Sequence, residues 1–437
     1  MKVRFSRAAA GLQLVALFAL LACSQVFAAE EPKADSILPA PPLNQRVYVA
    51  SRVYASLENF AHSQNAPNLA VDAAYRAYLD KAIASQDRKT FSLAGMEFLA
   101  AFKNAHTVFI DMAVAQQGGE LPFLAQSVHG QWVVTESMSP GLNPGDVIDK
   151  IGDRTFDQFV QDCGRVISAS TEAGAQHLLF ARMTIVTPYA HLFPQQFVLT
   201  LSDGKKVSID RRTLKGASLD TEGRWLEPGK VAYIRIHTLL GPDFEKRAVE
   251  LANEYRQAQA IIVDVRGEPG GSTPSDLTSF LMDRPSQWWT ESTPVEMPYF
   301  RFRAAEGNGA YQPFERSTLT WLSPVHPPAK DVFTGKLAIL TDAGCYSACE
   351  DFVMPFKVTH RALIVGQTTG GSTGNATMID LGQGMMVMVG VKRVSFPDGS
   401  PLEGVGIKPD VEVEPTVEDL RAGKDTVLEA ARERLSQ

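Results

Sequence analysis

The chain has 437 residues, of which 45% are hydrophobic, a proportion that is ordinary for globular proteins with large cores. Its formal net charge is −7 and it contains no long basic run, which argues against nucleic acid as a partner. The length that remains after removal of an N-terminal signal predicts two to three domains.

Residues 1–28 have the pattern of an export signal. Basic residues such as Lys2 and Arg4 precede an apolar stretch that ends in small residues. Cleavage after Ala28 fits this pattern, and the alternative is a lipobox that leaves Cys23 as a lipidated first residue. We therefore expect export to the periplasm or cell envelope of a bacterium, with membrane association only if Cys23 is lipidated.

Residues 29–44 are rich in proline and alanine and predict a mobile lead-in. Residues 45–120 are expected to form an N-terminal helical domain. Apolar residues such as Val49 and Val53 recur there at helical spacing, as far as about Met112.

Residues 121–215 are predicted to be rich in β-strands. The stretch from Gly141 to Ile148, Gly-Leu-Asn-Pro-Gly-Asp-Val-Ile, looks like the core of a PDZ module. Such a module adds an extended peptide to a strand, so that main-chain hydrogen bonds supply affinity and pockets supply specificity. The alternative is that this region is structural only.

Residues 225–437 alternate apolar strand patterns with helical ones, which predicts a layered α/β core. Expected strands are 231–236, 260–265, 336–341 and 362–365, and expected helices are 244–255, 275–282 and 347–358. Many aromatic residues and prolines occur between residues 288 and 328. That segment is either a lid facing the substrate or a two-stranded hairpin packed on the core.

Ser347 stands where an apolar strand, residues 336–341, gives way to a helix that starts Ala-Cys-Glu. A helix N-terminus has free backbone N–H groups that can hold a developing oxyanion, so a serine there is a candidate nucleophile. The alternative is a plain capping box, because Ser347 is followed three residues later by Glu350.

Two further strands end in glycine-rich loops, at residues 264–272 and 366–374. In open α/β sheets, ligands bind beyond the carboxyl ends of the strands. We therefore expect these two loops and the Ser347 turn to meet at one site.

On these features the sequence resembles the S41 serine peptidases, the family of tail-specific or C-terminal processing proteases and tricorn core proteases. The resemblance rests on four separated stretches, residues 264–271, 347–350, 366–374 and 402–410. It implies a crotonase-like or ClpP-like catalytic core, and hence a multidomain α+β protein with an N-terminal helical domain and a PDZ-like domain.

The resemblance also favours one catalytic branch of that family. The processing-protease branch has a lysine base in a Gly-Lys-Gly loop, whereas residues 371–374 read Gly-Ser-Thr-Gly. The tricorn-like branch uses a histidine in a His-Thr context and a late glutamate, and His106, Thr107 and Glu403 match these positions. A serine precedes the histidine in tricorn, but here that residue is Ala105.

The roles implied by the resemblance form a serine hydrolase set. A serine hydroxyl needs a neutral imidazole to take its proton and a third group to orient that imidazole. The expected nucleophile is Ser347, the base His106, the polarising group Glu403, the supporting hydroxyls Ser372 and Thr373, and the oxyanion donors Ala348 with Gly270 or Gly271. Each role has an alternative: His106 as a structural histidine, Glu403 as a solvated turn carboxylate, and Gly270 with Gly271 as an ordinary glycine turn.

Cleavage after Ala28 leaves three cysteines, too few for a disulfide scaffold in a chain of this length. Cys345 and Cys349 either bridge locally beside Ser347 or remain two buried thiols, and we expect the thiols. We expect no metal and no cofactor.

The sequence therefore predicts an exported serine endopeptidase whose PDZ-like domain presents polypeptide substrate. One alternative is a catalytically silent scaffold that binds protein C-termini, motivated by Ala105 and by the absent lysine. Another is an esterase-type hydrolase, because an acyl-transfer site does not disclose its acyl donor.

Overall fold

A computed structural model describes residues 37–60, 66, 68–117, 119–181, 189–211, 220–241, 243–295 and 318–437. The predicted export signal, its cleavage point after Ala28 and the lipobox residue Cys23 lie outside these ranges, as do residues 29–36 of the predicted lead-in 29–44. Among the helices of these described ranges, none combines the length and the apolar character that crossing a membrane requires.

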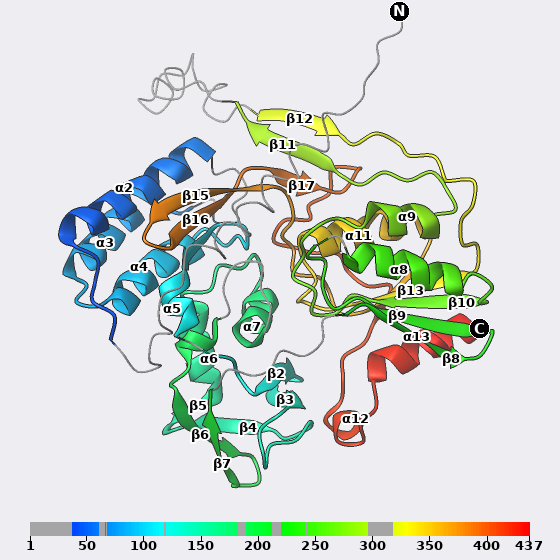
Figure 1. The fold of residues 1–437 in the computed structure, drawn as a ribbon, viewed down its shortest axis with the longest axis horizontal. Helices are drawn as coiled ribbons and strands as arrows, with labels where there is room; N and C mark the ends of the chain where they lie inside the picture. The colour runs from blue at the N-terminus through cyan, green and yellow to red at the C-terminus, as the bar shows by residue number, and fades with distance from the viewer. Residues whose placement is uncertain are drawn as a thin grey trace, which may run out of the picture. The chain divides into compact units, whose positions relative to one another are not determined.

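A six-stranded sheet organises the second half of the chain (Figure 1). Its order is β18-β14-β13-β10-β9-β8, and all neighbours pair in parallel except β8 with β9. The strands are β8 (Glu222–Glu227), β9 (Val231–Arg235), β10 (Ala260–Asp264), β13 (Lys336–Thr341), β14 (Leu363–Gly366) and β18 (Val411–Glu412). The expected strands and helices of this core are thus confirmed to within one or two residues, apart from β8 and β18, which were not predicted.

Helices cover both faces of this sheet, which explains why its strands are almost continuously apolar. On one face Ile234, Ile261 and Ile339 pack with α8 (Asp243–Glu254), α9 (Ser275–Leu281) and α11 (Ala348–Thr359). On the other face Ile262 and Leu340 pack with α13 (Thr426–Ser436). A short helix, α12 (Val417–Arg421), precedes α13.

The N-terminal helices pack on strands from the end of the chain. α2 (Leu43–Phe60), α3 (Val71–Ala84) and α4 (Arg88–Ala100) share one apolar core with β15 (Ala376–Gly382) and β16 (Met385–Gly390). The prediction that helical spacing continues to about Met112 is wrong, because residues 108–111 form a strand, β1 (Val108–Asp111), which pairs antiparallel with β16. All four of its residues are buried there, so tertiary pairing outweighs the apparent periodicity.

The region after β1 starts with the short helix α5 (Met112–Gln116) and continues as strands, as expected, together with two α-helices whose positions were not predicted. This region has its own hydrophobic core, which includes Phe123, Trp132, Phe156 and Phe180. The elements are β2 (Phe123–Val128), β3 (Gln131–Ser137), β4 (Ile148–Ile151), β5 (Arg154–Thr155), α6 (Phe156–Gly164), α7 (Glu172–Phe180), the 3-10 helix η1 (Tyr189–Leu192), β6 (Gln196–Leu201) and β7 (Lys206–Asp210). The chain thus has a mixed α/β fold with several sheets, while its PDZ-like identity and the proposed domain boundaries stay predictions.

The aromatic segment is a hairpin where it is described. β11 (Thr290–Pro294) pairs antiparallel with β12 (Thr318–Leu322) and also with β17 (Arg393–Ser395). Trp289 packs against the core of the six-stranded sheet. Residues 296–317 lie outside the described ranges.

Candidate active site

Ser347 lies in a sharp turn between β13 and α11. Its backbone has φ 59° and ψ −128°, a positive φ that is uncommon for a residue with a side chain. Its side chain forms no capping hydrogen bond with α11, so the predicted alternative of a capping box is wrong. The hydroxyl points instead at an imidazole: Ser347 Oγ lies 3.1 Å from His106 Nε2.

His106 is held in the turn between α4 and β1. Its backbone N–H donates to Asn104 Oδ1 at 2.8 Å, and its Nδ1 lies 3.0 Å from Ser372 Oγ. The two ring nitrogens therefore face two serine hydroxyls from the late part of the chain. Burial lowers the pKa of His106 to about 4, so the imidazole is neutral and able to accept a proton at physiological pH.

Glu403 is buried near His106 but meets the site through other residues. Glu403 Oε1 accepts the backbone N–H of Thr373 at 3.1 Å, and Oε2 accepts Asn104 Nδ2 at 3.4 Å. Since Asn104 also accepts the His106 N–H, Glu403 is linked to the histidine segment through Asn104. The hydroxyl beside the imidazole is that of Ser372, whereas Thr373 Oγ1 donates to Asp351 Oδ1 at 2.7 Å.

Glu350 organises residues 366–374, which we call the 366–374 loop. One carboxylate oxygen accepts Gly371 N–H at 2.9 Å and the hydroxyl of Thr369, and the other accepts Ser372 N–H at 2.8 Å. Burial raises the pKa of Glu350 to about 7, although these hydrogen bonds oppose the rise. The side chain that suggested a capping box therefore fixes the loop that carries Ser372.

Residues 264–271, which we call the 264–271 turn, bring a glycine against the nucleophile. A Cβ placed on Gly270 would lie 2.6 Å from Ser347 Cβ and 3.1 Å from the backbone nitrogen of Ala348. Only glycine fits there, and φ is also positive at Gly270 and Gly271. Gly270 N–H donates to Glu268 Oε1 at 3.1 Å, while Gly271 bridges to Leu239.

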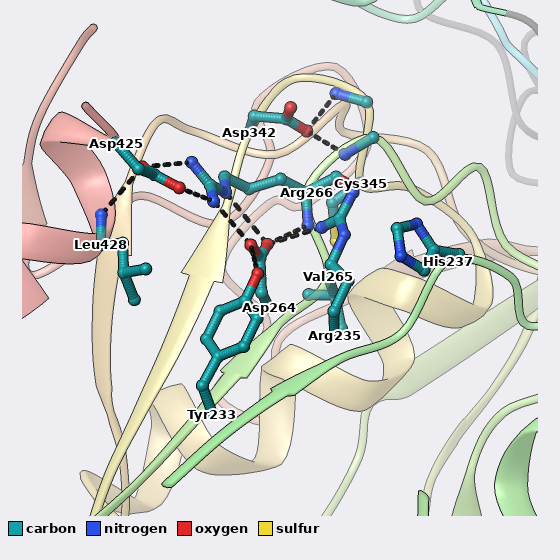
Figure 2. Close-up of polar contacts among 12 residues, drawn as sticks. Tyr233, Arg235, His237, Asp264, Val265, Arg266, Asp342, Cys345, Asp425 and Leu428 are labelled. Carbon is teal, nitrogen blue, oxygen red and sulfur yellow. Dashed lines mark hydrogen bonds and ion pairs between the residues drawn. The ribbon is translucent and has the colours of Figure 1, made fainter. Parts of the chain in front are cut away.

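An ion-pair network anchors the start of this turn (Figure 2). Arg266 Nη2 lies 2.6 Å from both Asp264 Oδ2 and Asp425 Oδ2, and Arg235 Nη1 lies 2.6 Å from Asp264 Oδ1. Burial opposes ionisation of Asp264, but the charges of Arg266 and Arg235 outweigh it and hold the pKa of Asp264 well below its usual range. Asp425 also caps α13, so the turn is tied to that helix.

Asp342 joins the 264–271 turn to the turn that carries the nucleophile. Its Oδ1 accepts Gly267 N–H at 2.7 Å and Gly344 N–H at 2.9 Å, the two dashed contacts of Asp342 in Figure 2. A single carboxylate oxygen therefore ties the 264–271 turn to the backbone segment that leads into Ser347.

Cys345 and Cys349 form a disulfide that flanks Ser347, with Cα atoms 5.3 Å apart. The expectation of two buried thiols is wrong. The turn before α11 brings the two residues within bridging distance, which sequence spacing alone did not reveal. The remaining cysteine of the described ranges, Cys163, is free and buried.

A small cavity lies beside the imidazole. Its lining is largely apolar and consists of Ala105, His106, Val108, Ser168, Leu178, Tyr189, Tyr346 and Met388.

The structure thus brings Ser347, His106 and Ser372 into direct contact and puts Gly270 beside Ala348. The sequence did not single out Asn104, Asp342 or Glu268 for a role. Glu268 does lie within a stretch that carried the resemblance, two residues before Gly270, and Asn104 lies two residues before His106. For Asp342 the only signal in the sequence was its position directly after a buried strand.

Comparison with known proteins finds a family match in the second half of the chain. Residues 230–413 match Peptidase family S41. A chloroplastic C-terminal processing peptidase of Tetradesmus obliquus is 36% identical over 81 residues, which are 18% of each chain. The carboxy-terminal processing protease CtpB of Bacillus subtilis (strain 168) is 26% identical over 215 residues, 48% of this chain and 38% of that protein.

A further relative is the chloroplastic carboxyl-terminal-processing peptidase 2 of Arabidopsis thaliana, 22% identical over 277 residues, 62% of this chain. The chain spans less than half the length of these curated relatives, since the largest share covered is 46%. Among solved structures, mature CPAF aligns with a TM-score of 0.65 at 16% identity, over 90% of this chain and 96% of that one. The photosystem II D1 C-terminal processing protease aligns with a TM-score of 0.50 at 17% identity, over 90% and 97%. These likenesses establish the fold, and the family match supports a serine-type peptidase.

Proposed function

We propose that residues 230–413, which match the model of peptidase family S41, are the catalytic core of an exported serine endopeptidase with a histidine base. The observation that carries the proposal is the 3.1 Å separation of Ser347 Oγ and His106 Nε2. It favours the tricorn-like branch of the family, because residues 371–374 contain no lysine and the imidazole stands at the hydroxyl instead.

In the proposed mechanism Ser347 Oγ attacks the carbonyl carbon of the peptide bond while its proton passes to His106 Nε2. Collapse of the tetrahedral intermediate breaks the C–N bond, and His106 returns the proton to the leaving amine. Water then attacks the acyl-enzyme by the same route and releases Ser347. The lowered pKa of His106, about 4, keeps the base neutral before each attack.

Orientation of the imidazole is assigned to Ser372, whose hydroxyl lies 3.0 Å from His106 Nδ1. This contact supplies the polar partner whose absence at Ala105 motivated the silent alternative. Glu403 acts further out, by holding Thr373 N–H and Asn104 on either side of the histidine.

The N–H of Ala348, at the start of α11, and that of Gly270 or Gly271 are the proposed donors to the oxyanion. The apolar cavity beside His106 suits a small apolar side chain of the substrate. We assign peptide presentation to the PDZ-like residues 121–215, by addition of a peptide strand.

The test is covalent labelling with a fluorophosphonate together with cleavage of a peptide library. We expect the parent protein to label and cleave, Ser347→Ala to do neither, and His106→Ala to lose about 10³-fold or more of the labelling rate. Folding of each variant is checked by circular dichroism.

Other outcomes point to the other functions. A folded parent that neither labels nor cleaves, yet binds peptides equally well with and without Ser347→Ala, is a scaffold. Hydrolysis of esters without amides, lost in both variants, identifies an esterase. Cell fractionation of the full-length chain tests export, and a mass shift on Cys23 would identify a lipoprotein.

A further inference from the structure

Glu268 is a buried acid beside the nucleophile that the mechanism above does not use. It is 1% exposed and lies two residues before Gly270, which packs directly on Ser347. Glu268 Oε1 accepts the Gly270 N–H at 3.1 Å, whereas Oε2 is buried without a hydrogen bond. The side chain therefore occupies the N–H group of Gly270, which is one of the proposed donors to the oxyanion.

We propose that Glu268 is a gate on the oxyanion site: its carboxyl group holds the Gly270 N–H in the resting protein and must release it before acyl transfer. This inference rests on the proposed function. It goes beyond it by naming a residue that restrains the site rather than one that performs the chemistry.

The geometry makes this contact suited to release. A buried acceptor that satisfies only one of its oxygens is held weakly, because the unpaired oxygen carries a desolvation penalty that movement of the side chain can relieve. An oxyanion is a stronger acceptor for Gly270 N–H than a neutral carboxyl group. Substrate binding can therefore displace Glu268 while the gate is neutral.

Charge decides how firmly the gate holds. Burial raises the pKa of Glu268 to about 8, while the N–H groups of Leu239 and Gly270 and the charge of Arg235 oppose the rise. Three other titratable residues face the turn. The backbone N–H of Tyr346 donates to the backbone carbonyl of Glu268, and Asp342 and His177 lie beside Gly267. Below about pH 8 the gate is neutral. Above it, a carboxylate binds Gly270 N–H more tightly and repels a developing oxyanion.

The first experiment observes the contact itself and needs no activity. Labelling with ¹³C-carbonyl proline and ¹⁵N-glycine selects the glycines that follow proline, which are Gly141, Gly145, Gly229 and Gly270. In full-length Ser347→Ala protein we expect the Gly270 amide signal to shift with a midpoint near pH 8. The three other glycines serve as internal references.

Two substitutions separate the contact from its titration. Glu268→Gln keeps an acceptor but has no charge to gain, so the Gly270 signal should no longer titrate. Glu268→Ala removes the acceptor and should move the signal at every pH. A Gly270 signal that stays flat in Ser347→Ala, or that titrates equally after Glu268→Gln, overturns the proposal.

The second experiment measures the consequence with a fluorophosphonate, in which the Ser347 oxygen bonds to phosphorus, fluoride leaves and the proton goes to His106. We expect labelling of the parent to fall above about pH 8 and Glu268→Ala to label at least about tenfold faster than the parent at pH 9, since one oxyanion donor contributes about 10²–10³ in rate. Glu268→Gln should lose the alkaline decline. A folded Glu268→Ala protein that labels no faster than the parent at pH 9 overturns the gate.

Glu245 provides a matched control. Burial also raises the pKa of Glu245, and its Oε1 accepts the N–H groups of Asp276 and Leu277 at the start of α9. Glu245→Gln should change neither the Gly270 titration nor the labelling rate. Absence of labelling in the parent and in Glu268→Ala at every pH overturns the proposed function, and the Gly270 signal then still decides whether Glu268 holds that donor.

Discussion

Two buried glutamates hold the two loops that contact Ser347, and they do so in different ways. Glu350 receives hydrogen bonds from the Thr369 hydroxyl and from the N–H groups of Gly371 and Ser372, so both of its oxygens are satisfied. Glu268 Oε1 accepts a hydrogen bond from Gly270 and Oε2 has no hydrogen-bond partner, although the Leu239 N–H also favours the ionised form of this carboxyl group. Burial raises the pKa of both carboxyl groups.

The difference lies in the number of satisfied atoms. A fully hydrogen-bonded buried acid fixes its surroundings, because removing it strands several donors at once. A buried acid with only one hydrogen-bonded oxygen can release its single N–H donor at a lower cost in free energy. We therefore interpret the 366–374 loop as a rigid support for His106 and the 264–271 turn as the adjustable side of the site.

Removal of Glu350 should have the largest effect. Glu350→Ala leaves three buried donors unpaired, at about 1–3 kcal/mol each, so we expect the free energy of unfolding to fall by about 3 kcal/mol or more. Urea unfolding of the variant in a Ser347→Ala background measures this loss. Glu412→Ala, an exposed change on β18, should stay within about 0.5 kcal/mol of the parent. Equal stability of Glu350→Ala and the parent would contradict the rigid-support interpretation.

The hydroxyl of Ser372 should matter for rate rather than for stability. Ser372→Ala removes the partner of His106 Nδ1, and we expect the fluorophosphonate labelling rate to fall by about 10–100-fold, because an unoriented imidazole is a poorer base. Ser92→Ala, which removes another buried hydroxyl that donates to Asp111, is the matched control and should leave the rate unchanged. A Ser372→Ala protein that labels at the parent rate assigns His106 orientation to other groups.

Asp342 tests the coupling of the 264–271 turn to the turn that carries Ser347. Asp342→Ala releases both Gly267 and Gly344, and we expect labelling to slow by about tenfold, since displacements of this kind act on the reacting geometry. Asp342→Asn retains an acceptor oxygen and should recover most of the rate. If the asparagine variant is as slow as the alanine variant, charge rather than spacing is the contribution of Asp342.

The smallest effect should be a dependence of stability on pH. Burial raises the pKa of Asp351 to about 6, of Glu350 to about 7 and of Glu268 to about 8, all above their ordinary values. The folded protein then binds more protons than the unfolded chain, so this stabilisation is complete at low pH and is lost as pH rises through 6 to 8. His106, whose pKa is lowered, acts in the opposite sense but only below about pH 6.5.

We therefore expect the thermal unfolding midpoint of Ser347→Ala protein to fall between pH 6.5 and 8.5. Adding Glu268→Gln should flatten the upper half of this decline. A midpoint that is constant or rises over the same range would show that these carboxyl groups are ionised in the folded state.

Much of the core was predictable from local pattern. Apolar runs of strand length that alternate with helical spacing predicted four strands and three helices of the core between residues 231 and 366 to within one or two residues, since both faces of their sheet are buried. The bounds of β11 and β12 were not predicted. The same signal failed at residues 108–111, where pairing with β16 turns an apparent helix into a strand.

By itself the sequence determined the S41 resemblance, the strand-to-helix position of Ser347 and the candidate histidine. Only the tertiary structure decided which group each side chain contacts. Ser372, and not Glu403, lies beside the imidazole, and Glu350 binds the 366–374 loop and does not form a capping box. Cys345 and Cys349 form a disulfide and are not two thiols, and Glu268 accepts the N–H of Gly270. The physical reason is that these contacts join residues far apart along the chain. The hydroxyl and the imidazole that meet at 3.1 Å are 241 residues apart in the chain, and local propensity carries no information about such a contact.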